Sequence, residues 1–113
     1  MTCLFCKIAS KEINANLIYE DDLVVAFHDI APQAPHHILI IPHKHIATIN
    51  DFSAEDTLLL GHMMQTGEKI AANLGIAEDG FRLVMNCNKH GGQAVYHIHF
   101  HLLGGRQMGW PPG

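Results

Sequence analysis

The sequence predicts an α+β domain built on an antiparallel sheet of five strands, with one long helix and one short helix. The 113 residues include 48% apolar and 16% charged side chains, enough to bury the core of one domain spanning residues 1–113. Short apolar runs bounded by turn residues predict strands, and one long stretch has helical periodicity. Strands and helices do not alternate regularly, which favours the α+β class over a parallel α/β sheet.

The N-terminal half predicts a short helix and three strands. The acidic residues Glu20–Asp22 separate two short apolar runs and indicate a hairpin turn. Pro32 and Pro35 disfavour a helix and predict a loop, and a β-branched run then closes at Pro42. The expected elements are a helix over 2–9 and strands at Leu17–Tyr19, Leu23–Phe27 and His37–Ile41.

The C-terminal half predicts the long helix and two further strands. Ser53 is a suitable N-cap, with Glu55 and Asp56 in the first turn, and Gly75 is expected to end the helix. Its apolar side chains recur at helical spacing and form one wide face. The remaining expected segments are a strand at Phe81–Asn86, a loop at Cys87–Gln93 and a last strand at Val95–Leu103.

Charge and cysteine content exclude several classes of function. The net charge of −4 is the wrong sign for binding DNA or RNA through phosphate contacts. No apolar run approaches the roughly 20 residues of a membrane helix, and the first residues lack the pattern of a secretory signal. Three cysteines are too few for a disulfide framework. We therefore expect a cytoplasmic protein without nucleic-acid or membrane partners.

Histidine is unusually abundant, with ten residues, and three of them alternate with apolar residues in the last predicted strand. Residues two apart share a face of a strand, so His97, His99 and His101 should point to the same side. Such a row suits either an open zinc site or nucleophilic attack on phosphorus. A solvated polar face is the structural alternative. The glycine-rich stretch His90–Ala94 favours phosphorus chemistry, because glycines allow backbone N–H groups to approach a phosphate.

These residues resemble a known family. His97–Leu103 resembles the histidine triad motif, in which three histidines alternate with apolar residues. Nearly the whole chain is similar to the histidine triad nucleotide-binding (Hint) branch of the HIT superfamily. The further segments that carry this similarity are Phe27–Ile30, Pro32–Pro35 with His37, Gly91–Gln93, Gly104–Met108 and Trp110–Pro112.

The resemblance implies a purine nucleoside phosphoramidase. His99 would attack the α-phosphorus of a nucleoside 5′-phosphoramidate or acyl-adenylate, and water would then hydrolyse the nucleotidyl-His99 intermediate to AMP or GMP. A backbone carbonyl is one candidate for holding the required tautomer of His99. His101 would hydrogen-bond the phosphate, and His97 would form a supporting pair with His37. Alternation along the third strand and the family register both favour His37 over its neighbour His36.

The same resemblance implies the binding residues. Apolar rings would hold the purine and the Asp29 carboxylate would accept hydrogen bonds from the ribose hydroxyls. Ala94 departs from the family pattern, because many relatives carry a serine there, so only its backbone N–H remains. Trp110, in the C-terminal tail, would complete the substrate site of the partner in a homodimer whose sheet continues across the two-fold axis. The expected nucleoside pocket is Phe5, Phe27, His28, Asp29 and Ile30, and the expected phosphate contacts are Asn86, Gly92, Gln93 and Ala94.

A metal site is a separate expectation. Cys3 and Cys6 have metal-ligand spacing, and in some relatives such a pair binds zinc together with histidines equivalent to His45 and His97. Chemistry at His99 itself requires no cofactor. The alternative functions are a dinucleoside polyphosphate hydrolase, a zinc hydrolase and a zinc-binding regulatory protein that binds nucleotides.

Overall fold

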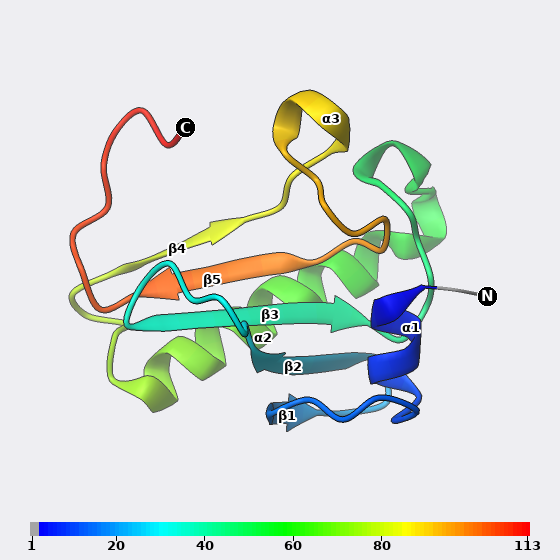
Figure 1. The fold of residues 1–113 in the computed structure, drawn as a ribbon, viewed down its shortest axis with the longest axis horizontal. Helices are drawn as coiled ribbons and strands as arrows, with labels where there is room; N and C mark the ends of the chain where they lie inside the picture. Colours follow the sequence, from blue (N-terminus) through cyan, green and yellow to red (C-terminus); the bar gives the residue numbers. More distant parts are fainter. Residues whose placement is uncertain (1–2) are drawn as a thin grey trace.

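The computed structural model describes residues 3–113, which form a five-stranded antiparallel sheet with a helix packed on each face (Figure 1). The strand order is β1-β2-β3-β5-β4, so β3 lies at the centre and β4 at one edge. The expected α+β class and antiparallel sheet are therefore confirmed. The strands are β1 Leu17–Glu20, β2 Val24–His28, β3 His36–Pro42, β4 Phe81–Val84 and β5 Phe100–Gly104, and the α-helices are α1 Leu4–Ala9, α2 Thr57–Leu74 and α3 Asn88–Gly91.

The hairpin of β1 and β2 is closed by Asp21, as the acidic turn predicted. Its carboxylate accepts hydrogen bonds from the backbone N–H groups of Leu23 (2.8 Å) and Val24 (2.9 Å). The second carboxylate oxygen lies 2.6 Å from Nε2 of His62 on α2. One side chain thus shapes the turn and ties it to the long helix.

Helix α2 covers one face of the sheet. Ser53 begins a 3₁₀ turn at Ala54–Asp56, its N–H donating to the Asp56 carboxylate (3.0 Å), and the α-helix proper starts at Thr57. The helix ends at Gly75, whose φ of 78° lies in the left-handed region, as expected of a terminating glycine. Met63 is fully buried in the core between helix and sheet, whereas Met64 on the same predicted face is half exposed.

Alternation along β3 separates two cores. Ile38 and Ile40 are fully buried beneath α2, while Leu39 and Ile41 pack on the opposite face with α1. Helix α1 is short, and Cys3 caps it by accepting a hydrogen bond from the Cys6 N–H (3.3 Å). Thr2, which the sequence placed in this helix, lies outside the described residues. The α1 face of the sheet is therefore only partly covered, which leaves space for a binding site there.

Two boundaries differ from the sequence prediction around β4. The strand ends at Val84 rather than Asn86, and the expected loop contains the short helix α3. Asn88 adopts a φ of 59°, which turns the chain out of the sheet, and Gln93 holds the turn by accepting a hydrogen bond from the Asn88 N–H (2.9 Å). Figure 1 shows α3 projecting beyond the sheet edge.

Candidate active site

The three triad histidines lie on the α1 face of the sheet, but only His101 lies in a strand. Strand β5 begins at Phe100, so the expected strand at Val95–Leu103 is too long at its start. Continuing the register of β3 and β5 would place Ile98 opposite Pro42, which has no N–H to donate. Ile98 instead donates to the carbonyl of Ile46 (2.8 Å). The expected alternation survives this irregularity, because the intervening apolar residues Ile98, Phe100 and Leu102 all pack into the core beneath α2.

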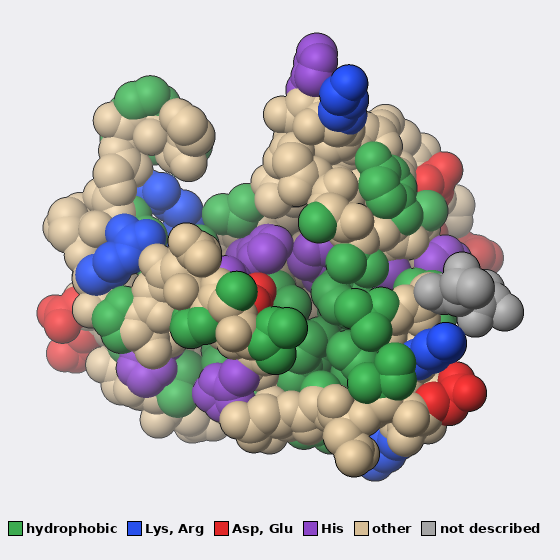
Figure 2. All heavy atoms as spheres, viewed as in Figure 1, with side chains coloured by type: hydrophobic (Ala, Val, Ile, Leu, Met, Phe, Trp, Pro, Cys, Tyr) green, Lys and Arg blue, Asp and Glu red, His purple; other side chains and the backbone are tan. Residues whose placement is uncertain are grey.

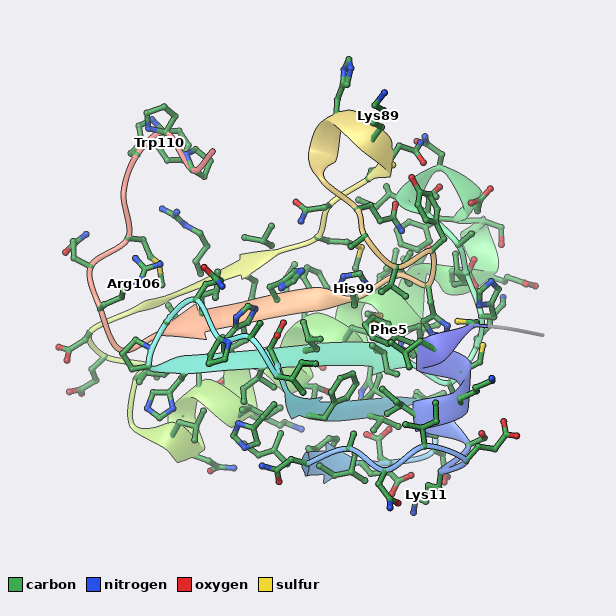
Figure 3. The ribbon with its side chains drawn as sticks, in the orientation of Figure 1. Phe5, Lys11, Lys89, His99, Arg106 and Trp110 are labelled. Atoms are coloured by element: carbon green, nitrogen blue, oxygen red, sulfur yellow. The ribbon has the colours of Figure 1, made fainter. Side chains whose placement is uncertain are left out.

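His99 is held in one tautomer by the backbone. Its Nδ1 lies 2.8 Å from the carbonyl oxygen of His97, which can only accept, so the ring proton lies on Nδ1 and Nε2 carries a lone pair. The ring is buried and meets Phe5 edge-to-face at a centroid distance of 5.0 Å (Figure 3). Burial lowers the pKa of His99, against the opposing effect of the His97 carbonyl and Asp29. A neutral imidazole with a free Nε2 is a competent nucleophile.

His101 and His37 form a directed chain of hydrogen bonds. The backbone N–H of Gln33 donates to Nδ1 of His37 (3.0 Å), so the proton of the neutral His37 ring lies on Nε2. That atom lies 2.9 Å from Nδ1 of His101 and donates to it. The proton of His101 therefore lies on Nε2, ready to donate to a ligand. The pairing expected between His37 and His97 is wrong: His37 faces His101.

Burial also keeps this histidine pair neutral. It lowers the pKa of His37, although Asp29, whose carboxylate lies 3.5 Å from Nε2, acts in the opposite direction. Burial and the neighbouring His99 and His37 rings lower the pKa of His101 to about 4. At neutral pH the triad face therefore offers hydrogen-bond donors and a lone pair without carrying positive charge.

An apolar hollow of about 390 Å³ lies on the Phe5 side of His99. The rings of Phe5 and Phe27 meet edge-to-face at 5.6 Å and form its walls. His28 and Asp29 lie at its rim, and Ile30, although part of the lining, is fully exposed. The structure thus brings the five expected pocket residues together. Further lining residues that the sequence interpretation missed are Leu4, Ile8, Ile13–Asn16 and Leu39.

Leu39 could have been found from the sequence. It lies two residues after His37 in the same strand, so it shares the face of the histidines. Residues 13–16 gave no comparable signal, because their position depends on the path of the loop that links α1 to β1.

A second hollow of about 450 Å³ opens on the other side of the histidine row; we call it the C-terminal cleft. His37 and His101 contribute to its wall, and Asn86 lies beside them. In Figure 2 it is the hollow between the C-terminal tail and the protrusion formed by α3. The complete lining is Gln33, His37, Arg82, Val84, Asn86, His101, Leu103, Arg106, Met108, Gly109 and Pro111–Gly113.

The glycine-rich segment has a more structural role than expected. The Gln93 amide donates to the carbonyls of Ala47 (2.7 Å) and Val95 (3.1 Å), and its side-chain oxygen accepts from Asn88. These contacts occupy the side-chain amide of Gln93, so in this structure it holds the loop that leads to the triad segment. Gly92 ends α3 with a φ of 78°. Neither of the two hollows is lined by Gly92, Gln93 or Ala94.

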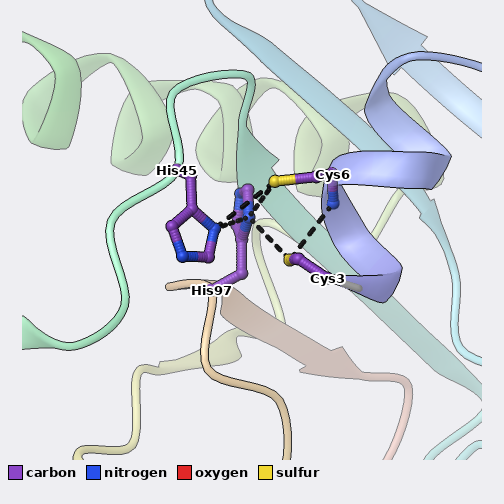
Figure 4. A group of neighbouring side chains, drawn as sticks. All are labelled: Cys3, Cys6, His45 and His97. Atoms are coloured by element: carbon purple, nitrogen blue, oxygen red, sulfur yellow. Dashed lines mark hydrogen bonds between the residues drawn. The ribbon is translucent and has the colours of Figure 1, made fainter. Parts of the chain in front are cut away.

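A candidate metal site lies beside His97. The Nδ1 atom of His97 lies 3.4 Å from the Cys3 sulfur, 3.5 Å from the Cys6 sulfur and 3.1 Å from Nδ1 of His45 (Figure 4). All four donor atoms lie within 4.8 Å of one another. Nε2 of His97 donates to the Pro42 carbonyl (2.8 Å), which leaves the Nδ1 lone pair pointing at the cluster.

This donor set fits zinc. Two thiolates and two imidazoles are a common tetrahedral set for Zn²⁺. Burial and the adjacent Cys3 raise the pKa of the Cys6 thiol to about 11, so without a cation the Cys6 sulfur stays protonated. The three cysteines Cys3, Cys6 and Cys87 are free thiols.

Comparison with known proteins identifies the fold family. A model of the HIT domain matches residues 10–108. The chain belongs to the HIT family. This HIT protein is 60% identical over 106 residues to the purine nucleoside phosphoramidase of Escherichia coli (strain K12), covering 94% of this chain and 89% of that protein.

Solved structures agree with this assignment of the HIT protein. A HIT family hydrolase from Legionella pneumophila Philadelphia 1 superposes with a TM-score of 0.98 at 59% identity, covering 99% of this chain and 100% of that one. A histidine triad protein from Clostridium difficile gives a TM-score of 0.94 at 42% identity, covering 96% and 95% of the two chains. Within residues 3–113, no helix is both long and apolar enough to cross a bilayer.

Proposed function

We propose that this HIT protein hydrolyses the P–N bond of purine nucleoside 5′-phosphoramidates, and also acyl-adenylates, to give AMP or GMP. The observation that carries this proposal is the ring of His99, whose Nδ1–H is bonded to the His97 carbonyl so that Nε2 is free. The 60% identity to the E. coli purine nucleoside phosphoramidase supports the same activity.

The reaction proceeds in two steps. Nε2 of His99 attacks the α-phosphorus, the P–N bond to the leaving group breaks, and a nucleotidyl-His99 intermediate forms. The leaving amine takes up a proton from solvent, because the neutral His101 ring that the His37 chain orients donates a hydrogen bond and not a proton. Water then attacks phosphorus and gives up one proton to solvent, the bond to His99 breaks, and the nucleoside 5′-monophosphate leaves with the free ring restored. Hydrogen bonds from His101 also stabilise charge on the phosphate oxygens.

The apolar hollow accepts the nucleoside. Phe5 and Phe27 enclose the purine with apolar surface, and the Asp29 carboxylate accepts hydrogen bonds from the ribose hydroxyls. Asp29 is pre-oriented for this task, since its other oxygen already accepts the Ala31 N–H (2.8 Å). On the opposite side, Asn86 faces the phosphate or the leaving group.

His97 acts through its backbone and through the metal cluster. Its carbonyl orients His99, and its ring belongs to the group with Cys3, Cys6 and His45. Zn²⁺ bound there would supply a structural crosslink between α1 and the triad segment. These side chains would then fix Phe5, which neighbours the cysteines in α1, against His99. The chemistry at phosphorus needs no added metal in this proposal.

We further propose a cytoplasmic homodimer. The edge strand β4 is the element through which a second copy would extend the sheet across a two-fold axis, since its outer edge has no strand partner among residues 3–113. Trp110 supports this idea, because 85% of its surface is exposed in a tail that offers it little to pack against. A partner's active site would provide a surface for the indole.

The deciding experiment is hydrolysis of adenosine 5′-phosphoramidate by the purified protein, followed by phosphorus NMR. We expect AMP to appear at a rate that EDTA does not change. A dinucleoside polyphosphate assayed in parallel should be turned over far more slowly. Loss of activity with EDTA would instead support a zinc hydrolase. Faster turnover of the dinucleoside polyphosphate would support a dinucleoside polyphosphate hydrolase. Nucleotide binding without turnover of either compound would favour a regulatory protein.

A further inference from the structure

The turn that follows β5 brings an arginine against the loop that precedes β3. Strand β5 ends at Gly104, where a Cβ atom would overlap Cδ1 of Ile76. Gly105 has a φ of 94°, and a Cβ atom there would lie 2.8 Å from Cβ of Pro35. Both positions therefore need glycine, because a side chain at either would push the turn away from its neighbours. The close approach places Arg106 beside the loop (Figure 3).

The loop between β2 and β3, residues 29–35, is not fixed by the core. Residues 30–33 are all exposed. The two prolines of the loop have no N–H to donate, which limits the hydrogen bonds that the loop can make with itself. The Gln33 side chain donates to the Ala31 carbonyl (3.0 Å), a contact within the loop. Hydrogen bonds to other parts of the chain must therefore hold the loop in place.

Arg106 supplies such bonds from 73 residues away. Its Nε (3.2 Å) and Nη2 (2.9 Å) both donate to the backbone carbonyl of Gln33. Its Nη1 donates to the Gln107 carbonyl (3.1 Å), which ties the guanidinium to its own turn. The guanidinium is planar and stays charged at all relevant pH values, so it can place two N–H groups on one carbonyl.

The backbone N–H of Gln33 selects the tautomer of His37. It donates to Nδ1 of His37 (3.0 Å), so Nε2 of His37 carries the proton and donates to Nδ1 of His101 (2.9 Å). In the other tautomer, His37 would turn a lone pair towards His101. The proton of His101 would then lie on Nδ1, and its Nε2 would present a lone pair to the phosphate. One N–H thus decides whether His101 is a donor to the substrate.

We propose that Arg106 is a positioning residue for the reaction. By holding the Gln33 carbonyl, it keeps the Gln33 N–H on His37 and so keeps His101 a hydrogen-bond donor. This inference rests on the proposed phosphoramidase function and adds a residue that acts on the same site through the loop, without contact with the reacting atoms. It also gives a role to the segment Gly104–Met108, which belongs to the family resemblance.

The first test is kinetic and uses adenosine 5′-phosphoramidate. We expect kcat of Arg106→Gln to fall by about tenfold, the effect of one charge-assisted hydrogen bond. KM should change little, because Arg106 does not line the apolar hollow proposed to bind the nucleoside. Arg106→Lys, which keeps the charge but not the planar fork, should retain part of the lost activity. Lys69→Gln, an equal charge change at an exposed position of α2, should keep wild-type kcat.

A double-mutant cycle tests the route through His37. In a His37→Gln background the ring that Gln33 orients is absent, so adding Arg106→Gln should have little further effect on kcat. An equal fall in kcat in both backgrounds would show that Arg106 acts by another route and would overturn the inference.

The second test reads the tautomers directly. Long-range ¹H–¹⁵N NMR spectra of the ligand-free wild type near neutral pH should show Nδ1 of His37 and of His101 unprotonated and both Nε2 atoms protonated. Arg106→Gln should give a mixture of tautomers, a change that a general loss of stability would not produce. Unchanged tautomers or an unchanged kcat in this variant overturns the role of Arg106 and leaves the phosphoramidase function intact. No hydrolysis by the wild type overturns the proposed function, and this inference with it.

Discussion

The Nδ1 atom of His99 lies 2.8 Å from the carbonyl oxygen of His97, so the backbone of one triad residue fixes the ring of the next. This contact is local, spanning two residues, yet it determines which nitrogen of the buried ring is free. The segment can make it because residues 97–99 lie outside β5 and their carbonyls are not required by the sheet ladder.

Replacing His99 by alanine should abolish turnover. We expect kcat for adenosine 5′-phosphoramidate to fall by about 10³-fold or more, because the nucleophile is lost. The apolar hollow keeps its phenylalanine walls, so much of the nucleotide affinity and a normal circular dichroism spectrum should persist. His90→Ala, a change at an exposed position of α3, is the matched control and should retain wild-type kcat. Wild-type kcat in His99→Ala would disprove the mechanism.

A nucleotidyl adduct should form on His99 during turnover. Rapid quenching with radiolabelled substrate, followed by peptide mapping, should place the label on the peptide that contains residues 97–101. The same protocol applied to His99→Ala should give no labelled peptide. Label on a different peptide of the wild-type protein would contradict covalent catalysis at this residue.

The Cys3→Ser/Cys6→Ser double variant should lose thermal stability but keep most of its catalytic activity. The two sulfurs lie 3.4 and 3.5 Å from Nδ1 of His97, so they would complete the proposed zinc site and crosslink α1 to the triad segment. We expect a chelator to lower the Tm of the wild type but not that of the variant, with kcat changed by no more than a few-fold. Cys87→Ser serves as the control. A collapse of kcat at unchanged Tm would favour a metalloenzyme.

Protonation of His101 should make the fold acid-sensitive. Burial and the neighbouring rings lower its pKa to about 4, whereas an unfolded histidine has a pKa of about 6.5. The unfolded state therefore binds more protons between these values. The stability from this group is complete above about pH 6.5 and is lost as the pH falls towards 4. Thermal melts should show a smaller loss of Tm over this range for His101→Gln than for the wild type, and parallel curves would count against the assignment.

The C-terminal tail should influence substrate choice without holding the dimer together. Deleting residues 108–113 removes Trp110 and part of the wall of the C-terminal cleft. We expect the ranking of leaving groups to change while light scattering still reports a dimer. A wild-type protein that is monomeric at micromolar concentration would rule out the dimer. An unchanged substrate ranking after truncation would remove the proposed role of the tail.

Much of the fold could be predicted because its signals are local. Asp21 in the acidic turn, Pro42 at the end of a β-branched run and Gly75 after the long helix each mark a boundary through their own backbone preferences. The predicted boundaries of strands and helices were wrong where a contact with another part of the chain determines them. The start of β5 depends on what lies opposite Ile98, and the helix α3 depends on Gln93 reaching the Asn88 N–H.

The alternation of histidine and apolar residues by itself determined that His97, His99 and His101 would share a face, since side chains in extended chain point alternately to opposite sides. It did not determine their partners. Tertiary structure decided that His37 bonds to His101 and that the His97 ring turns towards Cys3, Cys6 and His45. It also placed Arg82 and Arg106 in one cleft. Such contacts join residues far apart in the chain, so they follow from strand order and loop path, which no local pattern of residues specifies.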